Sequence, residues 1–209
     1  MSANFFNTIK KSFADVHIDR TNTDAIDAID TTEFLEASES LLTLFASKLT
    51  QPDVLGSSAF RPVKNDMAGN IKKIRDRQLA APVESENLQS LVINELKAKK
   101  HTATEGMLWL TRGLDFTAQA LRHNISNPSE ELSTSFRTAY TGTLKPHHGM
   151  LIKPLFSAAM SACPYRKDFY AKLLPNESTG KEQMETWLSA LEERVGILKD
   201  FLAGKTAKW

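Results

Sequence analysis

The sequence predicts an all-α protein in which one domain packs its helices in layers. Apolar residues recur at helical spacing along most of the chain, and no stretch shows the apolar/polar alternation that is typical of β-strands. Helix-start signals and prolines divide this pattern into about eight helices joined by short loops. The 209 residues are enough for one domain with a sizeable core, and no internal repeat or long linker splits the chain.

The first 30 residues differ in composition from the rest of the chain. They are polar and rich in Asp and Thr, so we expect residues 1–30 to be loosely ordered apart from Phe5 and Phe6, and residues 31–209 to form the domain. The amino terminus shows no basic region followed by a long apolar run, and no window approaches the roughly 20 apolar residues that span a bilayer. We therefore expect a cytoplasmic protein without a secretory signal.

Apolar periodicity places four helices in the first part of the domain. One spans residues 31–49, and a second follows Pro62, which suits the first turn of a helix. A third lies near residues 88–97 and has a basic end. The fourth covers residues 102–123, opens with a Thr-x-x-Glu capping box and is apolar on more than one face. A helix that is apolar most of the way round is usually central.

The remaining residues continue the helical pattern. One helix follows Pro128, a short piece surrounds Phe169, and a last helix covers residues 181–202. Between them, residues 144–159 predict a further helix with bends at its prolines. The stripe of that helix would contain Leu144, His148, Leu151, Leu155 and Ala159.

Net charge and cysteine content exclude several classes of protein. A net charge of +1 gives no reason to expect bulk nucleic-acid binding. The single cysteine, Cys163, excludes an intramolecular disulfide framework and fits a reducing compartment. No activating group lies beside Cys163 in the sequence, so we expect it to be a small buried apolar residue.

Asp66, Asn70 and Lys73 form the most informative polar pattern. On a helix their spacing brings them within roughly 60° of one another, beside the apolar stripe that begins at Val63. Polar groups beside a core-facing stripe need hydrogen bonds, and a carboxylate, an amide and an ammonium in a row suit a ligand rich in hydroxyl groups. A solvated helix edge with an ion pair would give the same pattern, so both interpretations stay open.

Trp109 and Arg112 are neighbours on the surface of the predicted central helix. An aromatic ring beside a fixed cation offers a platform on which the C–H face of a sugar can stack, with hydrogen-bonding groups nearby for its hydroxyls. A core tryptophan and a surface arginine would have the same spacing, so this alternative also stays open.

The histidines and carboxylates predict no metal site and no evident catalytic site. His147 and His148 precede Gly149, but no further ligands follow at workable spacing for zinc. The chain has no phosphate-binding glycine loop, nucleophile elbow or Cys–His signature. Asp66 and His148 could do acid–base work in principle, although they are far apart in sequence. We therefore expect neither a metal nor a cofactor.

Four short patterns occur together, in order and well spaced. They are Asp66-x3-Asn70-x2-Lys73, Trp109-Leu-x-Arg112-Gly-Leu, His148-Gly149 and Ala162-Cys163-Pro164-Tyr165-x-x-Asp168-Phe169. From about Glu33 to the carboxy terminus the chain thus resembles the glycolipid transfer protein family. The resemblance implies a two-layer helical sandwich of about eight helices, with a polar surface site for a sugar headgroup and an apolar pocket between the layers for ceramide chains. It also implies a carrier rather than an enzyme.

The resemblance further implies roles for single residues. Asp66 and Asn70 would hydrogen-bond sugar hydroxyls, with Lys73 as an additional donor, and Trp109 would stack on the first sugar. His148 would hydrogen-bond the carbonyl of the ceramide amide, and Asp66 the amide N–H. His148 is preferred to its neighbour because it immediately precedes glycine, as in the family pattern. Additional contacts at this site are expected from His147, Arg112 and Trp209.

The pocket and the docking surface follow from the same resemblance. Animal members of the family carry a docking tryptophan just after the His-Gly pair, whereas this chain has Met150. Met150 can still insert among lipid tails while basic side chains reach the headgroups, so membrane contact is expected to be transient and peripheral. These basic residues are Lys145, Lys153, Arg166 and Lys167. The expected pocket lining is Val63, Leu144, Leu151, Leu155, Phe156, Ala159 and Phe169.

Two positions indicate the cargo. Relatives that carry ceramide-1-phosphate typically have lysine at the position of Asn70 and arginine at that of Trp109, so the amide and the indole of this chain favour a neutral sugar. The expected partners are galactosyl-, glucosyl- or lactosylceramide, bound by a monomer. Three alternatives remain: a lipid sensor or signalling adaptor, a glycolipid-processing enzyme that uses Asp66 and His148, and a helical scaffold without a ligand.

Overall fold

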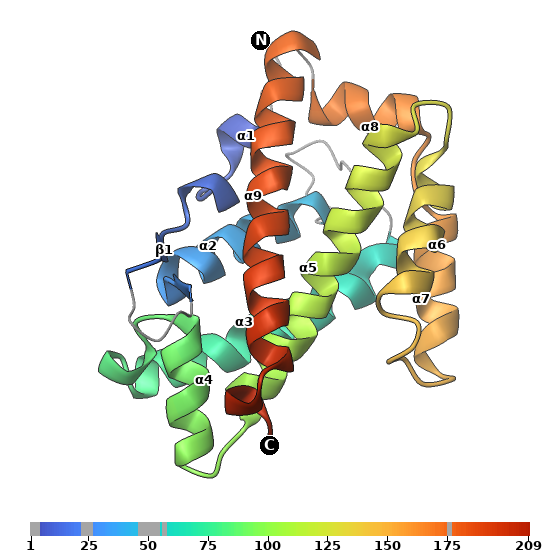
Figure 1. Ribbon diagram of the computed structural model, residues 1–209. Coiled ribbons are helices and arrows are strands. Elements are labelled where there is room, and N and C mark those ends of the chain that lie inside the picture. Colours follow the sequence, from blue (N-terminus) through green and yellow to red (C-terminus); the bar gives the residue numbers. More distant parts are fainter. Residues whose placement is uncertain (1–4, 22–26, 46–54, 56–57, 175–176) are drawn as a thin grey trace.

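Figure 1 shows a computed structural model of the protein, which describes residues 5–21, 27–45, 55, 58–174 and 177–209. Within these ranges the chain forms nine α-helices, five short 3-10 helices and one two-stranded sheet. The predicted all-α class is therefore confirmed.

The α-helices are α1 (Phe5–Thr8), α2 (Thr31–Leu41), α3 (Arg61–Ala80), α4 (Leu88–Lys97), α5 (Thr102–Ser126), α6 (Leu132–Gly142), α7 (Ile152–Ser161), α8 (Arg166–Leu173) and α9 (Glu177–Ala203). The 3-10 helices are η1 (Phe13–Asp15), η2 (Leu42–Phe45), η3 (Ser58–Phe60), η4 (Val83–Ser85) and η5 (Lys205–Ala207). Strands β1 (Ile18–Asp19) and β2 (Ala28–Ile29) pair antiparallel, with Ile18 opposite Ile29. The helix predicted over residues 31–49 thus appears as α2 followed by η2, and residues 46–49 lie outside the described ranges.

The helices form two layers, with α5 in the centre. In Figure 1, α9 and α5 lie in front, α2 and α3 cross behind them, and α6 and α7 flank α5 on the right. Helix α5 packs against α3, α4, α6 and α9. Buried residues occur on most sides of α5, which confirms the prediction that it is central.

Helix α5 crosses α3 at close range at Gly106. A Cβ atom on Gly106 would lie 3.0 Å from Cβ of Lys73 and 3.1 Å from the carbonyl oxygen of Asn70. Such short contacts mean that any larger residue would force the two helices apart, and glycine permits the approach because it has no side chain. The crossing point therefore lies directly beside the polar row of α3.

The start of α5 is held by a residue of α4, and the capping box predicted at residues 102–105 does not form. His101 occupies the N-cap position and makes no side-chain cap bond. Instead, the buried carboxylate of Glu95 accepts hydrogen bonds from the backbone N–H groups of Ala103 at 2.9 Å and Thr104 at 2.7 Å. A carboxylate satisfies the unpaired N–H groups of a helix start and the positive end of its dipole. A tertiary contact has replaced the local one.

The amino-terminal segment is packed where it is described, contrary to the expectation of loose order. Phe13 and Val16 are buried, and the ring of Phe13 meets Trp187 of α9 edge-on with 5.7 Å between centroids. Arg194 of α9 donates from Nη2 to the carbonyl oxygen of Val16 at 2.8 Å. Isolated apolar residues in a polar stretch produce no periodicity, so the sequence pattern did not reveal this packing. Residues 1–4 and 22–26 of that segment lie outside the described ranges.

Turns replace the first half of the helix predicted over residues 144–159. Helix α6 ends at Gly142 and α7 begins at Ile152. Pro146 lies in this interval and cannot donate the backbone hydrogen bond that a continuous helix requires. The segment between α6 and α7 therefore forms turns. Residues of α7 consequently do not continue the helical face that the pattern predicted from Leu144 onwards.

None of the helices in the described ranges combines the length and the apolar content that crossing a bilayer requires.

Candidate functional site

The polar row predicted on the second helix of the domain forms one edge of α3. Asn70 donates from Nδ2 to Oδ2 of Asp66 at 3.4 Å, and Lys73 lies close enough to act electrostatically on the same carboxylate. Asn70 is only 4% exposed, whereas Asp66 is exposed to solvent. The apolar stripe beside the row is buried from Val63 onwards, as predicted. The row is therefore a polar edge that joins the core to the surface.

Partial desolvation changes the charge balance at Asp66. The surrounding protein removes part of the hydration of this carboxyl and raises its pKa, and the positive charge of Lys73 opposes that shift. No ion pair within 4 Å between Asp66 and a cation occurs among the described residues, since Asp66 only receives the long hydrogen bond from Asn70. Its carboxylate oxygens thus keep most of their capacity to accept hydrogen bonds from a ligand.

An aromatic platform lies on the neighbouring helix, one turn after Gly106. The half-buried ring of Trp109 has the guanidinium of Arg112 over it at 4.8 Å from the ring centroid. Burial lowers the pKa of Arg112 from its usual high value. Because Gly106 contacts Asn70 and Lys73, Trp109 lies on the part of α5 that borders the polar row.

His148 comes to the same place from the turn between α6 and α7. Its imidazole is stacked with Trp109, with 5.9 Å between ring centroids and 21° between the planes. Tyr140 of α6 places its hydroxyl oxygen 3.2 Å from Nδ1 of His148, and Phe156 of α7 lies 4.5 Å from the imidazole centroid. The tertiary fold therefore unites residues of α5, α6 and α7 that no local pattern connects. No sequence pattern singled out Tyr140, so its contact with the site was not predicted.

The environment of His148 disfavours the charged form of its imidazole. Burial lowers the pKa of His148, and the positive charges of His147, Lys153 and Arg112 lower it further. His147 is exposed and meets Trp109 edge-on at 6.5 Å, and its pKa is lowered by burial and by Arg112. Both histidines thus contact the aromatic platform, and among the described residues His148 is the one whose side chain is held by a hydrogen bond.

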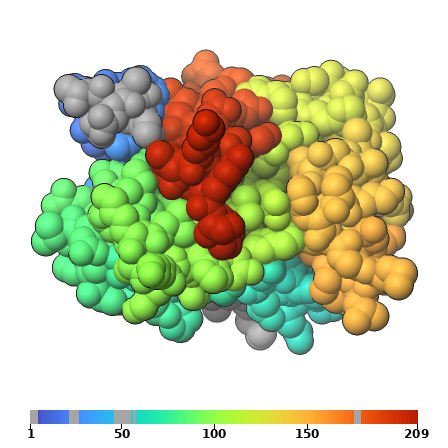
Figure 2. Space-filling view, turned by 60° about the horizontal axis from the view of Figure 1, so that its bottom comes forward, coloured from blue at the N-terminus to red at the C-terminus, as the bar shows by residue number. Residues whose placement is uncertain are grey.

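The carboxy terminus approaches α5 at a different point. The indole of Trp209 is 55% exposed and stacks with His101, at 6.2 Å between centroids and 17° between planes. Figure 2 shows the carboxy-terminal residues in red, lying over the green segment that contains α4 and the start of α5. Trp209 therefore lies beside the start of α5, the helix that carries Trp109, and its predicted contact with the ligand stays a prediction.

The predicted pocket residues divide into two groups. The predicted place of Leu151 and Leu155 in the pocket stays a prediction, although Leu151 is 87% exposed and Leu155 is 46% exposed, so neither side chain is buried in this structure. The cause is the turn before α7, which resets the helical phase. The other five are buried: Val63, Leu144, Phe156, Ala159 and Phe169.

Exposed apolar side chains gather where α7 begins. Met150 is 86% exposed, and Leu151, Ile152 and Leu155 extend the patch. Exposed lysines flank it, namely Lys145 and Lys153. Arg166, predicted to reach lipid headgroups with them, is held elsewhere, because its Nη1 donates to the carbonyl oxygen of Asn124 at 2.6 Å.

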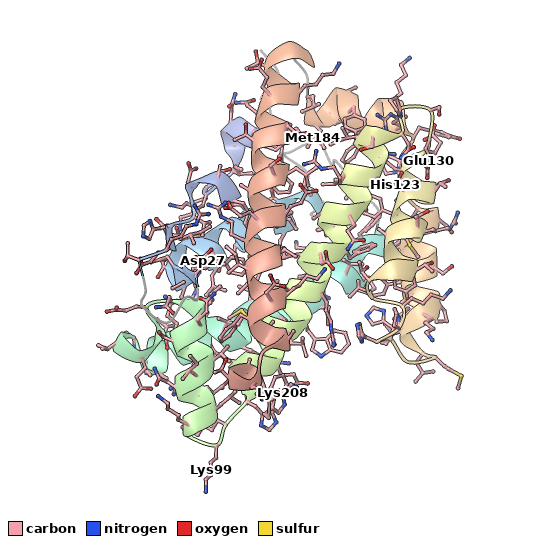
Figure 3. The ribbon with its side chains drawn as sticks, viewed as in Figure 1. Asp27, Lys99, His123, Glu130, Met184 and Lys208 are labelled. Carbon is pink, nitrogen blue, oxygen red and sulfur yellow. The ribbon has the colours of Figure 1, made fainter. Side chains whose placement is uncertain are left out.

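Other polar clusters lie away from this site. Figure 3 shows His123 and Glu130 at the far end of α5 from Lys99 and Lys208, and His123 Nε2 lies 2.9 Å from Oε2 of Glu130. A cleft of about 1070 Å³ near Met184 is lined by α8, α9 and the end of α5, and its walls carry charges of both signs. None of the predicted site residues lines this cleft.

The described residues offer little for catalysis. Burial raises the pKa of Cys163 to about 12, so the thiol stays protonated. No hydrogen bond joins Asp66 to His148 in the described part of the chain. Asp66 accepts a hydrogen bond from Asn70, and His148 is hydrogen-bonded to Tyr140. Across the same ranges, no group of three or more His, Cys, Asp or Glu side chains could hold a metal ion.

Comparison with known proteins identifies relatives along nearly the whole chain. The family model described as glycolipid transfer protein matches residues 29–175. The chain is 62% identical over 205 residues to a glycolipid transfer protein of Aureobasidium melanogenum, covering 98% of this chain and 96% of that protein. It is 30% identical over 207 residues to human pleckstrin homology domain-containing family A member 8, covering 93% of this chain but only 37% of that longer protein.

Solved structures agree with these relatives. The fungal glycolipid transfer protein HET-C2 superposes with a TM-score of 0.90 at 59% identity, covering 99% of this chain and 100% of that one. A FAPP2 structure, solved to explain how FAPP2 selects simple glycosphingolipids using the same fold, gives a TM-score of 0.81 at 28% identity. The match covers 99% of this chain and 98% of that one. Human ceramide-1-phosphate transfer protein, at 13% identity and a TM-score of 0.75 over 87% of this chain and 89% of that one, shares the fold.

Proposed function

Because this chain belongs to the glycolipid transfer protein family, we propose that it binds a glycosphingolipid and carries it between membranes without altering it chemically. The observation that supports this most directly is the meeting of the α3 polar row with the Trp109 platform at the Gly106 crossing. A sugar needs both a stacking face and hydroxyl partners, and this edge provides them side by side.

The headgroup roles follow from the chemistry of each side chain. Asp66 accepts from sugar hydroxyls and from the ceramide N–H, Asn70 both donates and accepts, and Lys73 donates. Trp109 stacks on the first sugar, and His148 donates to the ceramide carbonyl. The raised pKa of Asp66 supports this assignment, since a partly desolvated carboxylate that has no ion-pair partner among the described residues gains most from ligand hydrogen bonds.

The ceramide chains would insert among the buried side chains that lie inward of this edge. Val63 begins the stripe beside the polar row, and Phe156 contacts both His148 and Tyr140. An apolar interior that adjoins the headgroup site removes the cost of exposing the chains to water, about 0.8 kcal/mol for each CH₂. Because of this cost a free two-chain lipid crosses water very slowly, so a protein that encloses the chains speeds its movement between membranes.

Cargo choice depends on the neutral groups of the site. Phosphate oxygens chiefly need donors, whereas Asn70 provides both donor and acceptor and Trp109 provides one N–H. Lys73 and Arg112 alone would suit an anion, but Arg112 already lies over the indole. We therefore propose galactosyl-, glucosyl- or lactosylceramide as cargo, with little binding of ceramide-1-phosphate.

Transfer requires a reversible contact with membranes. The exposed patch of Met150, Leu151, Ile152 and Leu155 adjoins the turn that carries His148. Exposed Lys145 and Lys153 flank it and suit anionic headgroups. We propose that a monomer docks through this patch on cytoplasmic membrane surfaces, so that the lipid enters beside His148.

A vesicle assay tests the proposal. Donor vesicles with equal amounts of galactosylceramide and ceramide-1-phosphate are mixed with acceptor vesicles and the protein, and both lipids are quantified by mass spectrometry. We expect galactosylceramide to move faster by at least about tenfold, the factor that one lost charge-assisted hydrogen bond implies. Equal rates would contradict a sugar-selective carrier. Binding without transfer would favour a sensor, and conversion to new products would favour an enzyme.

A further inference from the structure

We infer that Tyr140 is a positioning residue of the site: its hydroxyl donates to Nδ1 of His148 and so keeps the imidazole proton on Nε2, where it is available to a ligand. The use of that proton by the ceramide carbonyl rests on the proposed function. The position of the proton itself is a property of the lipid-free protein, and it can be measured independently.

The hydroxyl group of Tyr140 is held in place by aromatic packing. Tyr140 is buried, its ring stacks with Phe156 at 5.4 Å and 12°, and Phe116 meets it edge-on at 6.3 Å. A ring packed on these contacts has one accessible position for its oxygen. That position is 3.2 Å from Nδ1 of His148.

The imidazole is equally restricted. Phe156 lies 4.5 Å from its centroid and Trp109 is stacked with it at 5.9 Å, so a ring flip that exchanges the two nitrogens would disturb both contacts. With both rings held, the remaining variable is which nitrogen carries the proton. A neutral imidazole has one donor and one acceptor nitrogen, and the partner of one determines the role of the other.

The donor in this pair is the phenol. Among the described residues, the Tyr140 hydroxyl has one hydrogen-bond partner, which is Nδ1 of His148. If Nδ1–H donated instead, the buried phenolic proton would have no acceptor in this part of the chain, which is unfavourable. Burial raises the pKa of Tyr140, so the phenol keeps its proton. Arg112 from α5, His147 from the same turn and Lys153 from α7 all disfavour a positive charge on His148.

This arrangement has a consequence for ligand choice. Only the Nε2–H form can donate to an amide carbonyl, and the other form would present a lone pair to the carbonyl oxygen. Tyr140 therefore acts on the ceramide part of the cargo and not on its sugar. Loss of its hydroxyl should weaken transfer of galactosyl-, glucosyl- and lactosylceramide by the same factor, whereas a headgroup residue would distinguish among them.

The test measures the ring nitrogens of His148 by NMR in lipid-free protein labelled with ¹⁵N-histidine. The His148→Gln variant assigns the signals among the five histidines. We expect the Nε2–H form in the parent and a gain of the Nδ1–H form in Tyr140→Phe, which retains the ring packing. Transfer should fall about fivefold, which corresponds to one neutral hydrogen bond of about 1 kcal/mol.

Tyr170→Phe is the matched control. It also removes a hydroxyl group, one that donates to Oδ1 of Asn124 at 3.0 Å on α5, far along the helix from Trp109. We expect the signals of His148 and the transfer rate to stay at the parent values in this variant.

Each outcome decides the inference. A His148 proton on Nδ1 in the parent protein would by itself overturn the inference. An unchanged tautomer in folded Tyr140→Phe would also overturn it, and a changed tautomer with unchanged transfer would overturn the role in lipid binding. If the parent transfers no glycolipid at all, the proposed function fails, while the NMR result still determines whether Tyr140 sets the tautomer.

Discussion

The indole of Trp109 and the imidazole of His148 lie stacked, 5.9 Å apart at their centroids and inclined by 21°. Trp109 belongs to the central helix α5, whereas His148 belongs to the turn that precedes α7. Their contact joins the predicted sugar platform to the predicted amide donor. Under the proposed function, a ligand that reaches one of these rings also reaches the other, which would couple recognition of the headgroup to recognition of the ceramide.

Replacement of Asp66 by Val should abolish transfer and leave the fold intact. Charge-assisted hydrogen bonds of about 1.5–3 kcal/mol each would be lost, so we expect at least a tenfold loss in the vesicle assay. Folding raises the pKa of Asp66, so the folded protein is less stable when this carboxyl is charged than when it is protonated. The contribution of Asp66 to the free energy of unfolding therefore falls as pH rises through the raised pKa. At neutral pH the melting temperature of Asp66→Val should therefore equal or exceed that of the parent. Asp76→Ala, on the same helix and paired with Lys72, is the control and should retain transfer.

Replacement of Trp109 by Phe should remove most of the fluorescence change on addition of galactosylceramide. The smaller ring stacks less well, so transfer should also fall by about two- to tenfold. Trp187 is buried against Phe13, and Trp209 stacks on His101, so both contribute background emission. An intact response in Trp109→Phe, together with its loss in Trp209→Phe, would assign the reporter to the carboxy terminus.

The double replacement Asn70→Lys and Trp109→Arg should move preference towards ceramide-1-phosphate. The new cations provide the donors that phosphate requires, and the ratio of the two transfer rates should shift by about tenfold or more. The gain should be incomplete, because Asn70 is buried and a lysine there must extend its ammonium to the surface. The two single variants measured in parallel show which position contributes, and an unchanged ratio in the folded double variant would contradict the assignment of these two positions.

Replacement of Gly106 by Ala should destabilise the protein by about 1–3 kcal/mol, the usual cost of overpacking. The added methyl group would press on Lys73 and on the backbone of Asn70, and backbone atoms cannot rotate away. Transfer should fall as well, because the polar row would shift relative to Trp109. Gly196→Ala in α9 meets no atom within 4 Å and should be stabilising by about 0.4–1 kcal/mol. Chemical denaturation of both variants provides the comparison, and equal stability would argue against the close crossing.

Transfer should persist at pH 6.5, at which an ordinary histidine is half protonated. The pKa of His148 is lowered in the folded state, so the unfolded chain binds more protons between that value and 6.5. Stability should therefore decline as pH falls below about 6.5 and level off below the folded pKa. Denaturation across this pH range should show a smaller decline in His148→Gln than in the parent. Equal slopes in parent and His148→Gln would place the titration elsewhere.

Local patterns predicted the helical class, the central position of α5 and the polar row of α3. These features depend on residues three or four apart, whose relative positions helix geometry sets regardless of the rest of the chain. Predictions failed where a distant residue replaced a local signal. Glu95 of α4 holds the start of α5 in place of the capping box, and Phe13 packs on α9 from a segment without periodicity.

The sequence by itself determined the family, the helical architecture and the residues that carry the polar chemistry, because spacing along a helix and ordered motifs are properties of the chain alone. Only the tertiary structure decided that α3 and α5 meet at Gly106, that Tyr140 contacts His148, and that Leu151 and Leu155 face solvent. These relationships join separate segments. They depend on which side chains fill the space between packed helices, and close packing is a condition on the whole core that no window of sequence contains.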